Sequence, residues 1–430
     1  MKKILLAALL VAMAVAMVGA QGTTIRVLLS NHPYTEFLKP LIPEFERTYG
    51  VKVNLETYDE NQLSAKLMTE FATRMSTVDV FMTRPLQEGK LMYLNGWYEN
   101  LSPYLKDSKK TPRDFDFGDF AQSAVGVSTY AKNVYAFPLV TEWQVLYYRT
   151  DLFAAAGLKP PTTFAELEAA AKKLTDPSKD QYGIVSRGQG NPAVTQFSSY
   201  LYGYGGDFLK GGKAAVESPE FLAALKYYGG LLKNYGPPGV TGMSWAQGLS
   251  LFQAGKVAMW TDASTFLGQI TDPAKSTVAD KVGVAAFPAG PKGNKPYFVT
   301  AWAMSIAKQS RQKAAAYNFL TWATSKAMLT KALGQASVAV ARNSPWSNPG
   351  ILAAFDATQK QLAETASKTI PLATGYDRPL MTAVGAARDA IGPLIVTAIE
   401  TGGTANQAAQ AKKVAESLNE LLDAAGELGK

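Results

Sequence analysis

The chain has 430 residues and a formal net charge of +8, with no cysteine and a single histidine. The lack of cysteine excludes disulfide bonds, thiolate-bound metal and thiol nucleophiles, and one histidine cannot build a multi-histidine metal site. The basic residues are scattered, with no polybasic run, so we expect no nucleic-acid partner. No phosphate-binding glycine loop is present, and we expect no metal and no cofactor.

The N-terminus has the pattern of a cleavable secretory signal peptide. Lys2 and Lys3 precede an apolar run over 4–18, and small residues follow before Gln21. The apolar run is too short for a comfortable membrane span. We therefore predict a signal peptide over 1–20, whose two lysines would take the formal charge from +8 to +6. Without a cysteine at the cleavage point no lipid anchor is expected, so the predicted location is periplasmic or secreted.

Strand and helix patterns alternate in the first part of the chain. Apolar strands are predicted from Thr24, Val51 and Val78, and the helical spacing of apolar residues predicts helices over 37–45 and 63–71. A βαβαβ order of this kind predicts a parallel sheet covered by helices. The rest of the chain is long enough for a second domain.

Polar residues follow two of these predicted strands. Asn31 and His32 come after the first strand, and Arg84 comes after the third. Ligands of open α/β sheets bind beyond the carboxyl ends of the strands, so all three residues are candidates for ligand contact. The alternative is a solvated loop. As the only histidine, His32 would also have to serve in any Ser-His-Asp triad, which we regard as the lesser interpretation.

The stretch "FQAGKVAMWTDAS", residues 252–264, places a tryptophan beside a carboxylate at the end of an apolar strand. Gly255 is expected to end a helix in the left-handed conformation, after which Trp260 and Asp262 would emerge at the strand end. A flat ring and a bidentate carboxylate suit the C–H face and the hydroxyls of a neutral sugar or polyol. The alternatives are that Trp260 is core and that Asp262 caps the next helix.

Six segments occur in a recognisable order and register, namely "IPEFERTYGVKV", "TVDVF", "YAFPLVTEWQVLYYRTDLFAAAGLKPPTTFAEL", "FQAGKVAMW", "VGVAAFPAGPKGN" and "AWAMSIAKQSRQKAAAYNFLTWATSK". Together they resemble extracellular solute-binding protein family 1 of ATP-driven importers, which includes maltose-binding protein. The "MWTDAS" segment and the residues after it are similar to the branch that binds polyols such as mannitol and sorbitol.

The resemblance implies a type II periplasmic-binding-protein fold. This is an α/β "Venus flytrap" of two lobes, each a mostly parallel sheet flanked by helices, around a cleft that closes about a hinge. The implied divisions are lobe 1 over 21–141 plus about 300–325, lobe 2 over about 147–297 plus about 326–430, and hinge segments near 142–146 and 298–303.

The resemblance also adds candidate ligand contacts. Glu142 and Trp302 lie on the two implied crossings between the lobes, and Tyr204 and Arg342 are further candidates. For Glu142 the alternative is a salt bridge that sets the hinge geometry, and for Trp302 it is core packing.

The implied function is that of a non-catalytic, monomeric receptor. As the extracytoplasmic binding component of an ABC importer, it would capture a neutral carbohydrate or polyol and deliver it to the permease and its ATPase. Two alternatives stay open. One is a secreted glycoside hydrolase that uses Glu142 and Asp262 as its carboxylate pair. The other is a receptor of related fold for a polyamine, or for iron held by Tyr147 and Tyr148.

Overall fold

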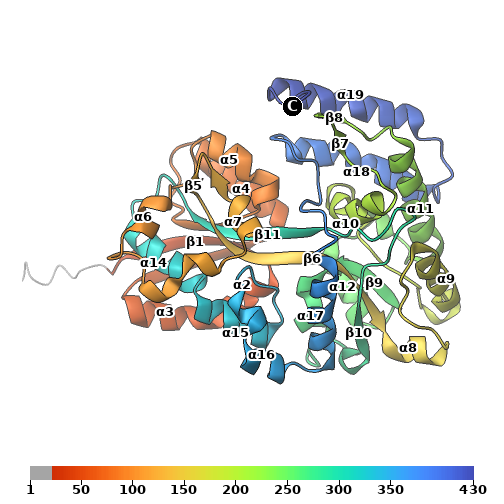
Figure 1. Cartoon of the computed structure of the whole chain (residues 1–430), viewed down its shortest axis with the longest axis horizontal. Helices are drawn as coiled ribbons and strands as arrows, with labels where there is room; N and C mark the ends of the chain where they lie inside the picture. Colours follow the sequence, from red (N-terminus) through yellow and green to blue (C-terminus); the bar gives the residue numbers. More distant parts are fainter. Residues whose placement is uncertain (1–21) are drawn as a thin grey trace, which may run out of the picture.

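Two lobes joined by long strands make up the molecule (Figure 1). The structure is a computed structural model that describes residues 22–430, so the predicted signal peptide over 1–20 lies outside the described residues. Strand β6 (Phe137–Arg149) carries the chain from lobe 1 into lobe 2, and β11 (Phe298–Ile306) brings it back. In the described range no helix is long and apolar enough to cross a membrane.

One curled sheet runs through both lobes. Its strand order is β10-β6-β11-β3-β1-β2, and β9 also pairs with β6. The parallel arrangement expected from the sequence is found where β1 pairs with β2 and β3. In lobe 2 the structure differs, because β9 and β10 both run antiparallel to β6. The remaining strands of this sheet are β1 (Thr24–Ser30), β2 (Lys52–Tyr58), β3 (Val80–Thr83), β9 (Met259–Ala263) and β10 (Val282–Ala286).

Helices pack around the sheet and form two separate hydrophobic cores, one in each lobe. The helices of lobe 1 are α2 (Pro33–Leu38), α3 (Ile42–Tyr49), α4 (Glu60–Ala72), α5 (Lys90–Leu94), α6 (Ser102–Lys106), α7 (Gln122–Gly126), α14 (Lys313–Ala323), α15 (Lys326–Ala336) and α16 (Pro349–Ala354). The helices of lobe 2 are α8 (Thr150–Ala155), α9 (Phe164–Leu174), α10 (Gly190–Gly203), α11 (Pro219–Tyr235), α12 (Trp245–Gln253), α13 (Leu267–Ile270), α17 (Ala357–Thr369), α18 (Val384–Glu400) and α19 (Ala408–Ala424). Two short hairpins, β4 (Thr129–Tyr130) with β5 (Asn133–Val134) and β7 (Leu209–Lys210) with β8 (Lys213–Ala214), complete the fold.

The chain returns to lobe 2 later than the sequence suggests. Met328 and Leu333 of α15 are buried in the core of lobe 1, whereas the boundary expected from the sequence was about residue 325. A third crossing follows α15 and runs beside β6, where the Thr141 N–H donates to the Ala339 carbonyl at 3.0 Å. Helix α17 then packs on β10 in lobe 2.

Local signals in the sequence set several helix ends. Gly50 ends α3 with φ 66°, and Gly255 follows α12 with φ 72°, the left-handed conformation that glycine adopts without a steric penalty. The Thr163 hydroxyl accepts from the Glu166 N–H at 3.2 Å and so begins α9. The Glu166 carboxylate in turn accepts from the N–H of Thr162 at 2.7 Å, the residue before the N-cap Thr163.

Helix α18 is held in place by close contact with α11. A Cβ added at Gly229 of α11 would lie 2.2 Å from the carbonyl oxygen of Ala398 in α18, so only glycine permits this approach. At the neighbouring Gly230 the nearest atom, the carbonyl oxygen of Gly402, is 3.5 Å away, which is an ordinary contact.

This difference gives a paired test of the helix contact. We expect Gly229→Ala to lower the free energy of unfolding by about 1 to 3 kcal/mol, because the added methyl overpacks against backbone. Gly230→Ala should be neutral or stabilising by up to about 1 kcal/mol, since alanine favours the helix. Urea denaturation of both variants measures the effect, and equal stabilities would contradict the close contact.

Candidate functional site: a charged pocket between the lobes

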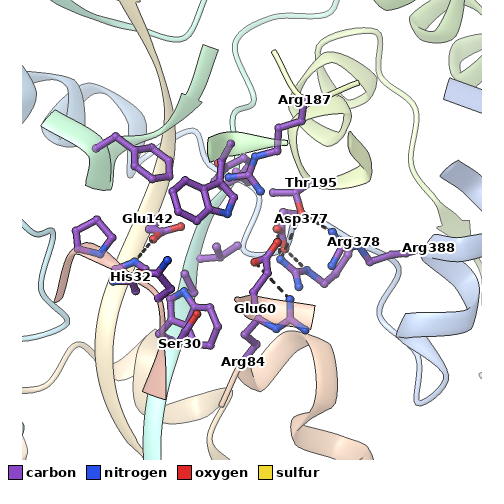
Figure 2. Close-up of a pocket in the computed structure, with 18 residues that line it drawn as sticks. Ser30, His32, Glu60, Arg84, Glu142, Arg187, Thr195, Asp377, Arg378 and Arg388 are labelled. Atoms are coloured by element: carbon purple, nitrogen blue, oxygen red, sulfur yellow. Dashed lines mark hydrogen bonds and ion pairs between the residues drawn. The ribbon is translucent and has the colours of Figure 1, made fainter. Parts of the chain in front are cut away.

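A pocket that is partly open to solvent lies between the lobes beside the crossing strands. Its walls carry both charges and aromatic rings (Figure 2). The lining residues are Ser30, Asn31, His32, Pro33, Glu60, Arg84, Glu142, Arg187, Thr195, Trp245, Phe266, Tyr297, Val299, Ala301, Trp302, Asp377, Arg378 and Arg388.

His32 and Glu142 form one side of the pocket (Figure 2). His32 precedes α2, where its Nδ1 accepts a hydrogen bond from the Tyr34 N–H at 3.1 Å. An accepting Nδ1 carries no proton, so the hydrogen of the neutral ring is on Nε2, which donates to Glu142 Oε1 at 3.1 Å. This bond occupies one of the two carboxylate oxygens of Glu142 and orients the other toward further partners.

Arg84 is fixed at the end of β3 by a neighbouring carboxylate. Its backbone N–H donates to Glu88 Oε1 at 2.6 Å, its Nε to Glu88 Oε2 at 3.3 Å, and its terminal nitrogen to the Ser64 hydroxyl at 2.7 Å. The guanidinium lies over the Trp302 ring, 5.7 Å from its centroid. Arg84 therefore presents a held donor to the pocket and covers one face of the tryptophan.

In lobe 2 Arg187 is held by a fully buried carboxylate. Its Nε donates to Asp262 Oδ2 at 3.0 Å and a terminal nitrogen to Asp262 Oδ1 at 2.6 Å, a bidentate pair. Gln196 and the Ala263 N–H also donate to Asp262, at 2.9 and 2.7 Å. Burial alone would lower the pKa of the Arg187 guanidinium, but the Asp262 carboxylate raises that pKa above its usual value.

Two further arginines of lobe 2 reach across to lobe 1. Arg378 Nε donates to Asp377 Oδ1 at 2.6 Å, and a second bond joins the same two side chains. Terminal nitrogens of Arg378 and Arg388 both donate to Gln87 Oε1, at 2.9 and 2.8 Å. Gln87 lies in a π-helical turn of lobe 1, η2 (Pro85–Gly89), so these bonds link the lobes.

The charges of the pocket compensate one another within the protein. Glu60, the first residue of α4, lies 3.4 Å from Arg84 and on the same side of the pocket as Asp377 and Arg378 (Figure 2). Burial would raise the pKa of Glu60, but the four surrounding arginines, led by Arg84, more than offset this and lower it. Asp377 is likewise buried, and Arg378 and Arg388 lower its pKa.

Comparison with a family of known proteins assigns this architecture. Residues 30–330 match the model of the bacterial extracellular solute-binding proteins. The chain belongs to this family.

Its relatives include receptors for polyols. It is 32% identical to the mannitol-binding protein of Pseudomonas aeruginosa over 332 residues, which cover 76% of this chain and 74% of that one. Among solved structures it resembles the ABC transporter solute-binding protein of Agrobacterium radiobacter in complex with ribitol, with TM-score 0.82, 30% identity and coverage of 93% and 99%. A counterpart from Agrobacterium vitis with bound D-mannitol gives TM-score 0.80 at 28% identity, with coverage of 93% and 97%. The fold is therefore the type II periplasmic-binding-protein fold expected from the sequence.

Five of the candidates from the sequence lie together in this solute-binding protein. The pocket is lined by Asn31, His32, Arg84, Glu142 and Trp302. Their role in contacting ligand stays a prediction.

Four other candidates lie away from the pocket surface. Trp260 has no exposed surface and packs between the rings of Tyr147 and Phe266 in the core of lobe 2. Asp262 is also fully buried, behind Arg187. The reason is that β9, on which both lie, is covered on both faces.

Tyr204 and Arg342 pack against other parts of the protein and do not line this pocket. Tyr204 follows α10 and packs against the ring of Phe164 at 6.0 Å. Arg342 is buried in lobe 1, where it donates to the carbonyl oxygens of Phe115 at 2.7 Å and Thr324 at 2.9 Å. It anchors the third crossing.

Sequence reasoning missed most of the charged residues of the pocket. Glu60 follows the end of β2, as Asn31 follows β1 and Arg84 follows β3, so its position after a strand is the signal that marks it. Arg187 comes two residues after Val185, which bridges β9, and carries a weaker form of the same signal. Asp377, Arg378 and Arg388 are brought in by long-range packing of α18 and had no local signal.

The buried pair of Arg187 and Asp262 predicts a large loss of stability on neutralisation. We expect Asp262→Asn to lower the free energy of unfolding by about 3 to 5 kcal/mol, because Arg187 would be left buried without its counter-charge. Urea denaturation followed by tryptophan fluorescence measures this change.

The matched control is Asp180→Asn. Asp180 pairs with Lys256 at 2.6 Å, and both side chains are largely solvated. Removing such an exposed pair should cost no more than about 1 kcal/mol. Similar losses in the two variants would contradict the structural role of Asp262.

Proposed function

We propose that this protein is the extracytoplasmic binding component of an ABC importer and that it captures an acyclic polyol or a small neutral sugar between its lobes. It would deliver that ligand to a membrane permease served by an ATPase. Support comes from the family, from a relative named as a mannitol-binding protein, and from similar structures solved with ribitol or D-mannitol. The observation that carries the proposal is the pairing of arginines with carboxylates inside the pocket. We further propose that the protein works as a monomer in the periplasm or outside the cell.

The pocket chemistry favours a neutral ligand with several hydroxyls. A hydroxyl both donates and accepts, and the pocket offers arginine donors such as Arg187 and Arg378 beside carboxylate acceptors such as Glu60 and Glu142. Three of the four pocket arginines already pair with protein carboxylates and Glu60 lies beside the fourth, so the charge of an anionic ligand would find no free counter-charge. A ligand that lacks a hydroxyl would leave charged groups unpaired, so selectivity is expected to be sharp.

The aromatic rings favour an extended chain over a sugar ring. A pyranose stacks its C–H face on a free aromatic surface, but Arg84 covers one face of Trp302. Trp245 stacks on Phe266 with ring centroids 5.4 Å apart and planes at 17°. The stacked faces of these two rings are therefore not free for a ligand.

Closure of the lobes is the mechanism we propose for binding. The bonds from Arg378 and Arg388 to Gln87, and an ion pair of Lys90 with Glu427, connect the lobes. A ligand that contacts both lobes shifts the population toward the closed form by its differential affinity. We place the hinge near 142–146 and 298–303, where the pairing of β6 with β11 changes register beside Trp302.

Three observations favour this proposal over the alternatives. A hydrolase would need Glu142 and Asp262 to face one bond, but Asp262 is buried against Arg187. An iron receptor would need exposed tyrosines, but Tyr147 is buried with its hydroxyl on the Ala263 carbonyl at 2.8 Å, and within residues 22–430 no cluster of potential metal ligands occurs. A polyamine would meet four arginines.

Ligand screening by thermal shift tests the proposal. A ligand that binds only the folded state at a hundredfold excess over its Kd stabilises it by about 2.7 kcal/mol. We expect such a shift with ribitol, mannitol or another small polyol, and none with spermidine or ferric citrate. A response confined to spermidine or iron would refute the proposed ligand class, and shortened products from oligosaccharides would identify a hydrolase.

Glu142→Gln tests the site itself. The exchange keeps the shape of the side chain and a hydrogen-bond acceptor for His32, but it removes an ionised acceptor for a ligand hydroxyl. Hydrogen bonds to charged groups contribute about 1.5 to 3 kcal/mol, so titration calorimetry should show a polyol Kd roughly 10- to 150-fold higher. An unchanged Kd would exclude Glu142 from the binding site.

A further inference from the structure

Glu60 occupies the centre of the arginine cluster. It begins α4 directly after β2, with Asp59 as the N-cap, and its carboxylate comes within 3.4 Å of Arg84. Arg84, Arg187, Arg388 and Arg378 all lower its pKa. The side chain is one-fifth exposed and lines the pocket, and no bidentate partner holds its carboxylate in the described chain.

Three of the four arginines have a carboxylate of their own. Arg84 pairs with Glu88, Arg187 with Asp262, and Arg378 with Asp377.

Arg388 is the exception. Its terminal nitrogens donate to neutral acceptors, namely Gln87 Oε1 at 2.8 Å, the Asn191 carbonyl at 2.8 Å and the Thr195 hydroxyl at 3.3 Å. Its Nε has no hydrogen-bond partner among residues 22–430, although the side chain is 2% exposed. Burial and the neighbouring Arg378 and Arg84 lower the pKa of Arg388, and Glu60 is the carboxylate that opposes this most strongly.

The Glu60 carboxylate supplies the negative charge that a ligand carboxylate would otherwise bring to the arginines. If Glu60 were neutral, one guanidinium charge would remain uncompensated beside the space for the ligand. A polyhydroxy acid could place its carboxylate there, in the charge-assisted geometry that arginine favours. With Glu60 ionised, the same acid would bring a second negative charge next to the first.

We propose that Glu60 is the specificity-determining residue that makes the pocket select neutral polyols and reject aldonic acids of the same chain length. This inference rests on the proposed function, since it assigns one residue to the choice of ligand at that site. Glu60 acts by occupying the position that the acid group of a sugar acid would take.

Titration calorimetry with matched ligand pairs tests the inference. The pairs are ribitol with ribonate and mannitol with mannonate, each measured on the wild-type protein and on Glu60→Gln. For the wild type we expect the acid to bind at least a hundredfold more weakly than the polyol. In Glu60→Gln the affinity for the acid should rise at least tenfold while that for the polyol falls, so the preference ratio changes by more than tenfold.

Glu142→Gln is the matched control. It makes the same chemical change in the same pocket, but Glu142 contacts His32 and no arginine, so no guanidinium loses its counter-charge. It should weaken polyol binding without any gain for the acid. A wild type that binds acid and polyol equally, an unchanged ratio in Glu60→Gln, or an equal gain in both variants would each overturn the inference.

A second measurement does not depend on the natural ligand. Formate can supply the missing carboxylate, so it should raise the melting temperature of Glu60→Gln and not that of the wild type. Formamide, and chloride at equal ionic strength, serve as controls. If no polyol binds the wild type, the proposed function fails, and the formate result still decides the inference: rescue of Glu60→Gln supports it and absence of rescue overturns it.

Discussion

Compensation of buried charge is the constraint on which the pocket between the lobes depends. An ion moved out of water loses several kcal/mol of solvation, so a buried arginine needs a counter-charge and further hydrogen bonds. Three of the four pocket arginines meet this demand with a carboxylate of their own, and Arg388 meets it in part with neutral acceptors. Arg187 with Asp262 shows the result: the guanidinium donates to both carboxylate oxygens, and one of them, Oδ1, also accepts from Gln196 and a backbone N–H. Donors fixed in this way need no reorganisation when a hydroxyl arrives.

The same constraint connects the charges to the movement of the lobes. The two cores are separate, so each lobe can move as a unit about the crossing strands. Gln87 on lobe 1 accepts from Arg378 and Arg388 on lobe 2, so opening would remove an acceptor from two arginines at once. Water can replace that acceptor in an open cleft. Under the closure mechanism that we propose, closing the lobes would then be sensitive to what fills the pocket.

How much of this could be predicted from the sequence depends on the range of each interaction. Helix ends, the three parallel strands and the polar residues after β1 and β3 follow from local patterns, and they lie where those patterns indicate. Trp260 and Asp262 were selected on their chemistry as a pair, but pattern alone cannot tell a strand end at a cleft from one that further chain covers. Asp377, Arg378 and Arg388 reach the pocket because α18 packs against α10 and α11, a contact between segments far apart in sequence.

The electrostatic field inside the pocket is set partly by groups that lie behind its surface. Asp262 is fully buried, yet it sets the position and charge of Arg187, which lines the pocket. Glu88 does the same for Arg84, and the backbone N–H of Tyr34 fixes the tautomer of His32. A substitution behind the pocket therefore changes the field inside it without altering its shape. Receptors of this fold could for that reason diverge in ligand preference while their lining residues stay the same, and lining residues alone are an incomplete guide to the ligand.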